Sequence, residues 1–97
     1  MGTYKLSILA EYDLEDIYAY GAHNFGNLQA IKYLEEIQQI VLLLSENPEM
    51  GRIRNEIKQG LVSYPYKSHV IFYRKFKQHI RIVRILYGGR DLVNFLR

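Results

Sequence analysis

The sequence predicts one α+β domain over residues 1–97, with elements in the order β-α-α-β-β-β. In the first half of the chain apolar residues recur at helical spacing, whereas three short runs in the second half are rich in β-branched and aromatic residues. Hydrophobic residues make up 48% of the 97 residues, enough for one core of two helices on a small sheet. This composition favours a folded domain over a disordered chain.

A short strand followed by a helix is expected first. Residues 4–9 predict the strand, and Ser7 is the expected N-cap, because its hydroxyl can accept a hydrogen bond from the next helical turn. Gly26 is expected to end the helix, since glycine readily adopts the left-handed conformation that closes one. Carboxylates gather where the helix begins and its dipole favours negative charge, at Glu11, Asp13, Glu15 and Asp16.

A second helix completes a helical hairpin. Asn27 is its expected N-cap, and Pro48 ends it, because the residue before a proline is pushed out of the helical region. A link as short as Gly26–Asn27 makes the two helices antiparallel. Residues 49–60 then predict an irregular polar segment. The apolar positions of the second helix recur at intervals of four and three, at Ala30, Leu34, Ile37, Val41 and Leu44.

Three strands are expected after this segment. Residues 60–65 begin the first, in which Pro65 must lie at an edge or a bulge because it has no N–H to donate. Residues 69–76 and 79–86 form the next two, joined by a hairpin tip at Lys77–Gln78. A short tail, residues 90–97, follows the Gly88–Gly89 break. Alternation along the last strand puts Ile80, Ile82, Arg84 and Leu86 on one face, and Arg81, Val83, Ile85 and Tyr87 on the other.

Charge is divided unevenly along the chain. Residues 1–50 carry Lys5 and Lys32 against eight carboxylates, a balance of −6. Residues 51–97 carry eleven Lys and Arg against Glu56 and Asp91, a balance of +9. This division favours a basic functional half that meets an acidic partner, either nucleic acid or an acidic peptide.

No cofactor, metal or membrane contact is predicted. The three histidines show no metal-ligand spacing, and the chain has no cysteine to complete a site. The longest apolar run, residues 40–44, is far shorter than a membrane span, and the N-terminal residues do not resemble a secretory signal. We therefore expect a cytoplasmic protein.

Six motifs follow one another along the chain. They are Leu6-Ser7-x-x-Ala10-x-x-Asp13-Leu14-x-x-Ile17, Phe25-Gly26-x-x-Gln29-Ala30, Glu46-Asn47-Pro48-Glu49-x-Gly51-Arg52-x-Arg54-x-Glu56, Gly60-Leu61-x-Ser63-x-Pro65, His69-Val70-Ile71-Phe72-Tyr73-Arg74 and Arg84-Ile85-Leu86-x-Gly88-x-Arg90-Asp91. Together they resemble the motifs of the ParE branch of the RelE/ParE toxins, over nearly the whole chain, in order and without a large insertion.

The resemblance implies a RelE-like fold, in which a twisted antiparallel sheet carries the helical hairpin on one face. It also implies a type II toxin that inhibits DNA gyrase by binding, not as an enzyme, and that a ParD-type antitoxin neutralises. Operator DNA is then met only indirectly, through the antitoxin. The candidate contacts with the target are Arg81, Arg84, Tyr87, Arg90 and Arg97. The candidate contacts with the antitoxin are Tyr18, Tyr33, Ile37, Tyr64, Tyr73 and Arg74.

The alternative is a RelE-type, ribosome-dependent mRNA endonuclease. RNA cleavage needs a general base, a general acid and cations that stabilise the phosphate. Cations are abundant, but the sequence shows no acid–base pair, and nothing in it places His69 near Tyr87. Tyr87 stands where related toxins most often have histidine, a group that titrates near neutral pH. If that histidine only packs, the replacement changes nothing; if it contacts the target, the target or the potency of the toxin differs.

Arg84 lies in an apolar strand, where a buried charge requires a carboxylate partner or a cleft. Asp91, just after the Gly-Gly break, or Glu56 is the expected partner. A contact with the target protein remains the alternative role for Arg84.

Overall fold

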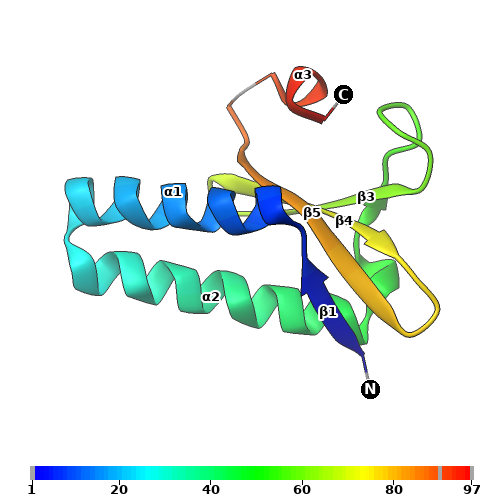
Figure 1. Cartoon of the computed structure of the whole chain (residues 1–97), viewed down its shortest axis with the longest axis horizontal. Helices are drawn as coiled ribbons and strands as arrows, with labels where there is room; N and C mark the ends of the chain where they lie inside the picture. The colour runs from blue at the N-terminus through cyan, green and yellow to red at the C-terminus, as the bar shows by residue number, and fades with distance from the viewer. Residues whose placement is uncertain (1, 90, 97) are drawn as a thin grey trace.

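Two antiparallel helices lie against one face of a five-stranded sheet in the computed structural model, which describes residues 2–89 and 91–96 (Figure 1). The α+β class and the helical hairpin are confirmed, and one short strand, β2, lies in the segment expected to be irregular. The elements are β1 (Thr3–Leu6), α1 (Ile8–Phe25), α2 (Asn27–Glu46), the 3-10 turn η1 (Pro48–Met50), β2 (Arg52–Ile53), β3 (Leu61–Tyr66), β4 (His69–Lys75), β5 (His79–Tyr87) and α3 (Leu92–Leu96).

The strand order across the sheet is β1-β5-β4-β3-β2. The pairs β2–β3, β3–β4 and β4–β5 are antiparallel, with Lys77 and Gln78 at the tip of the last hairpin, as the sequence predicts. β1 differs, because residues 3–6 run parallel to residues 79–82 of β5. The sheet is therefore mixed rather than wholly antiparallel. A parallel pair needs a long connection, and the helical hairpin and three strands lie between these two strands.

Two of the three predicted helix caps are confirmed. The Ser7 hydroxyl accepts from the Ala10 amide at 3.0 Å, and Gly26 ends α1 with a φ of 90°. The prediction for Asn27 was wrong: Asn27 is the first residue of α2, and its side chain makes no capping hydrogen bond. Its Oδ1 instead accepts from the Tyr18 hydroxyl at 3.1 Å, which links α1 to the start of α2.

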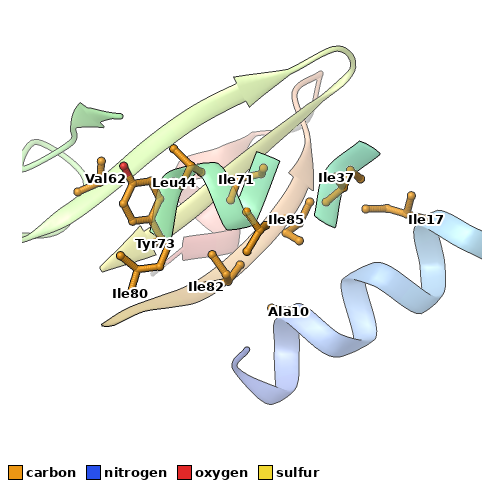
Figure 2. Close-up of a cluster of buried hydrophobic side chains, with 11 residues drawn as sticks. Ala10, Ile17, Ile37, Leu44, Val62, Ile71, Tyr73, Ile80, Ile82 and Ile85 are labelled. Carbon is orange, nitrogen blue, oxygen red and sulfur yellow. The ribbon is translucent and has the colours of Figure 1, made fainter. Parts of the chain in front are cut away.

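The main core fills the space between the hairpin and the sheet. Leu44 of α2 and the β4 residues Ile71 and Tyr73 are all fully buried in it, and Figure 2 shows them in one cluster. Phe72 lies between these two β4 residues and so points to the opposite face of the sheet. There it packs with Leu96 of α3 in a second, smaller cluster. The C-terminal helix thus covers part of the face that the hairpin leaves open.

A bulge interrupts the alternation predicted for β5. Phe72 is opposite Arg84 and Tyr73 is opposite Ile82, so Val83 has no partner on β4. Ile80 and Ile82 belong to the core under the helices, whereas Leu86 belongs to the second cluster. The prediction of one continuous face was therefore wrong, because the extra residue reverses the direction of the side chains that follow it.

Asp13 of α1 joins the hairpin to the edge of β5 that β1 leaves uncovered. Its carboxylate accepts from Arg84 Nε at 2.8 Å and Nη2 at 2.9 Å, and from the backbone amide of Ile85 at 2.9 Å. Only 7% of Asp13 is exposed. The Arg84 guanidinium also donates to the Phe95 carbonyl at 3.4 Å, so the pair links α1, β5 and α3.

The expected partners of Arg84 were therefore wrong. Asp91 accepts from Asn94 at 2.6 Å, and Glu56 pairs with Arg54 at 2.6 Å. The hydrogen bond with Asp13 raises the pKa of Arg84, in keeping with a guanidinium that stays charged inside the fold.

Replacing Asp13 with Asn should lower the free energy of unfolding by about 3 kcal/mol, because it leaves the Arg84 charge half-buried without a counter-ion. Urea denaturation measures this difference. The control is Glu15→Gln, an equal charge change at an exposed position of the same helix. If Asp13→Asn and the control agree within about 0.5 kcal/mol, the pair does not stabilise the fold.

Candidate functional site

A groove opens between the helical hairpin and the adjoining ends of β4 and β5. Its volume is about 770 Å³. Figure 1 shows the closed end of the hairpin projecting away from the strands, and the exposed rings of Tyr20 and Phe25 come from this end. Aromatic and apolar side chains dominate the lining, among them Ile17, Tyr20, Phe25, Tyr33, His69 and Tyr87.

A histidine lies between two tyrosines in the wall of this groove. The Tyr33 hydroxyl and His69 Nδ1 are 2.6 Å apart, and burial raises the pKa of Tyr33. His69 is directly opposite Tyr87 in the sheet, and their rings lie edge to face with centroids 6.1 Å apart. The structure therefore brings together His69 and Tyr87, a pairing that the sequence alone did not reveal.

Glu36 of α2 organises the neighbouring wall. It accepts from Tyr66 and from Lys67 Nζ, each at 2.8 Å, and Lys67 lies over the rings of Tyr33 and Tyr66. The hydrogen bond from Lys67 is the main cause of a lowered pKa at Glu36, and the same bond raises the pKa of Lys67. Sequence reasoning missed Glu36, because α2 and the β3–β4 turn meet only in the folded chain.

The candidate antitoxin contacts divide into core and surface residues. Ile37 and Tyr73 are 2% and 0% exposed, which places them in the core rather than on a surface that a partner could touch. The Tyr73 hydroxyl donates to the Pro48 carbonyl at 2.7 Å and accepts from the Gly51 amide at 3.1 Å. Tyr33 lines the groove. The others, Tyr18, Tyr64 and Arg74, are half-buried.

The candidate target contacts do not share one surface. Arg81 is exposed on the face opposite the helices, whereas Tyr87, 52% exposed, lines the groove on the helical side. The bulge at Val83 separates them. Arg84 is held by Asp13 and serves the fold. Arg90 and Arg97 lie outside the described residues.

Comparison with known proteins agrees with this architecture. A family model described as the ParE toxin of the type II toxin-antitoxin system parDE matches residues 4–92. The chain belongs to the ParE toxin family. Toxin ParE1 of Caulobacter vibrioides is 34% identical over 91 residues, 94% of each chain. Toxin ParE1 of Mycobacterium tuberculosis H37Rv is 34% identical over 90 residues, 92% of each chain.

A solved structure shares the fold of this ParE family member. A chain of the chromosomal ParDE TA system from P. aeruginosa superposes with a TM-score of 0.78 and 24% sequence identity, covering 90% of this chain and 96% of that one. Within residues 2–89 and 91–96, no three His, Cys, Asp or Glu side chains are grouped as metal ligands. In the same residues, no helix is long and apolar enough to cross a membrane.

Replacing Lys67 with Gln should raise the pKa of Glu36 toward its ordinary value of 4.5, because the hydrogen bond from Lys67 is the main cause of the lowered pKa. A pH titration followed by carbon NMR of the Glu36 carboxyl measures it. Lys32→Gln is the control, since Lys32 acts on Glu36 only through a weaker charge effect.

The same shift makes the stability of the fold depend on pH. Because the folded-state pKa is lowered, the stabilisation is present above the ordinary pKa and is lost as pH falls through the folded value. Equal pKa values for Glu36 in the Lys67→Gln variant and the unmodified chain would show that the hydrogen bond from Lys67 does not cause the lowered pKa.

Proposed function

We propose that this ParE family toxin acts by binding DNA gyrase, without catalysis, and that a ParD-type antitoxin silences it. The observation that carries the proposal is the family match over residues 4–92, which includes both long helices, all of β2 to β5 and all but the first residue of β1. Gyrase inhibition is the role described for the family. The −6 and +9 charge balances of the two halves of the chain also suit an acidic partner.

The groove is our proposed site for the antitoxin. Its lining is mostly apolar and aromatic, with Asp16, Gln29 and Lys67 among the polar members, and two of its rings are exposed in the free chain, Tyr20 and Phe25 at 67% each. Exposed apolar surface of this kind is typical of a site that a protein partner covers. An amphipathic segment could bury its apolar side against these rings and direct acidic residues toward Lys67 on the rim.

Replacing Tyr20 with Glu should weaken antitoxin binding about tenfold or more, because the charge enters the apolar wall of the groove. Tyr12→Glu is the matched control, since Tyr12 is 56% exposed on the same helix and does not line the groove. Calorimetry against a ParD-type antitoxin measures both variants. Equal losses of antitoxin affinity in Tyr20→Glu and Tyr12→Glu would mean that the antitoxin binds outside the groove.

For the gyrase contact we propose Tyr87 and the basic C-terminal half of the chain. Tyr87 is half exposed at the end of the longest strand, and tyrosine is common among residues that dominate protein interfaces. Its hydroxyl and ring retain two properties of the histidine found most often at this position in related toxins, but not the titrating group.

In a gyrase supercoiling assay, the purified chain should inhibit the enzyme at stoichiometric excess. Tyr87→Ala should require about tenfold more protein, as expected when an anchoring side chain is removed. Tyr12→Ala, which removes an equally exposed ring elsewhere, should inhibit as the unmodified chain does. Absence of inhibition by the unmodified chain would refute the gyrase proposal.

The contact between Tyr33 and His69 favours a second candidate, an mRNA endonuclease. A histidine at 2.6 Å from a tyrosine hydroxyl, beside Lys67, supplies the residue types that RNA cleavage by general acid–base catalysis needs. Primer extension on translated mRNA after induction separates the two. Cuts in the mRNA that disappear in the His69→Ala variant would establish the endonuclease. A full-length transcript would instead support the proposal that the chain acts on gyrase.

A further inference from the structure

The sheet face opposite the helical hairpin carries three cations in register across three neighbouring strands. Lys5 of β1 is opposite Arg81 of β5, and Arg81 is opposite Arg74 of β4. Lys5 lies between Tyr4 and Leu6, which pack under the helices, so it points to the other face. With strands about 4.8 Å apart, the row is roughly 10 Å long.

Carboxylates do not neutralise this row. Among the described residues, neither Lys5 nor Arg81 takes part in an ion pair, and Arg74 donates to the Gln59 carbonyl. Like charges directly opposite each other in a sheet destabilise it. An external anion would remove this repulsion, so the row is suited to a polyanionic ligand.

An aromatic platform lies beside the row on the same face. His79 precedes Arg81 by two residues in β5, so both side chains point the same way, and Phe76, one residue past the end of β4, contacts the His79 ring. The rings of Phe76 and His79 stack with centroids 4.9 Å apart and planes 6° from parallel. Half of Phe76, 51%, remains exposed, so His79 holds a flat ring in place with accessible surface.

We propose that this face binds single-stranded nucleic acid, with phosphates along Lys5, Arg81 and Arg74 and a base stacked on Phe76. Cations that follow a backbone beside rings that accept bases are the common chemistry of single-strand binding. An acidic peptide could meet the cations, but it would not use the ring platform. The proposal does not depend on Tyr87, which lies on the opposite face of the sheet.

Fluorescence anisotropy with a labelled oligonucleotide of about 12 residues tests the proposal on the purified chain without gyrase. Deoxythymidine and uridine strands distinguish DNA from RNA, and binding of either supports the proposal. The logarithm of the affinity should fall with the logarithm of salt concentration with a slope of about −2, as three phosphate contacts on a single strand predict.

Two matched pairs of variants make the test specific. Lys5→Gln with Arg81→Gln should bring the slope to about −0.7, whereas Lys32→Gln with Lys75→Gln, an equal charge change off this face, should leave it near −2. Phe76→Ala should weaken binding about fivefold or more, and Phe76→Tyr should retain it. Leu28→Ala, at an 87% exposed position in the hairpin, controls for loss of apolar surface.

Two results would overturn the proposal. The first is no oligonucleotide binding at low salt, and a polyglutamate peptide that then binds through Lys5 and Arg81 would identify an acidic peptide as the ligand instead. The second is an equal loss of affinity in the face variants and their controls. Circular dichroism on each variant shows that the fold is retained. Gyrase inhibition is measured separately, and its outcome does not decide whether this face binds nucleic acid.

Discussion

One buried carboxylate connects the parts of this fold. β1 pairs with only the first half of β5, so the second half of that strand has an open edge on this side. Asp13 occupies this open edge. Its carboxylate accepts a hydrogen bond from the Ile85 amide, as the carbonyl of a neighbouring strand would, and it also binds the Arg84 guanidinium. A buried ion pair is tolerated only when its donors and acceptors are satisfied. Here a bidentate pair and a backbone amide together meet that requirement.

The position of the helical hairpin follows from this contact. With α1 held against β5 at Asp13, the far end of the hairpin projects past the strands and leaves the groove beneath it. Arg84, from the other side of the pair, reaches the Phe95 carbonyl of α3. The contact therefore also fixes the helix that covers part of the opposite face. The Asp13–Arg84 pair thus contacts the elements that cover both faces of the sheet.

The bulge at Val83 gives the chain two different open surfaces. Before it, odd-numbered residues of β5 such as Arg81 face away from the helices; after it, odd-numbered residues such as Tyr87 face the groove. The aromatic groove and the basic row are consequently on opposite faces. A toxin built this way has room for an antitoxin on one face and a second ligand on the other.

Local signals were sufficient for much of the fold. Ser7, Gly26 and Pro48 mark helix ends through their own backbone chemistry, and Pro65 lies beyond the two β3 residues that pair with β2. Contacts between distant segments were not readable in the same way. β2 is only two residues long and exists because β3 pairs with it.

The role of Asp13 was hidden for the same reason. A carboxylate in the early part of a helix already has a sufficient local explanation in the helix dipole, and its partner lies 71 residues away. The Tyr33–His69 contact and the hydrogen bonds to Glu36 likewise join α2 to strands that follow much later. Their residue types were visible in the sequence, but their proximity was not.

Native-state hydrogen exchange at the Ile85 amide tests the central claim most directly, because this amide donates to the Asp13 side chain and not to a strand. If the carboxylate replaces a strand partner, the Ile85 amide should exchange only through near-global unfolding, as the central strand amides do. In Asp13→Ala, its protection should fall selectively while that of the Tyr73 amide in β4 falls no further than global stability does. Fast exchange at Ile85 in the unmodified chain would contradict the account.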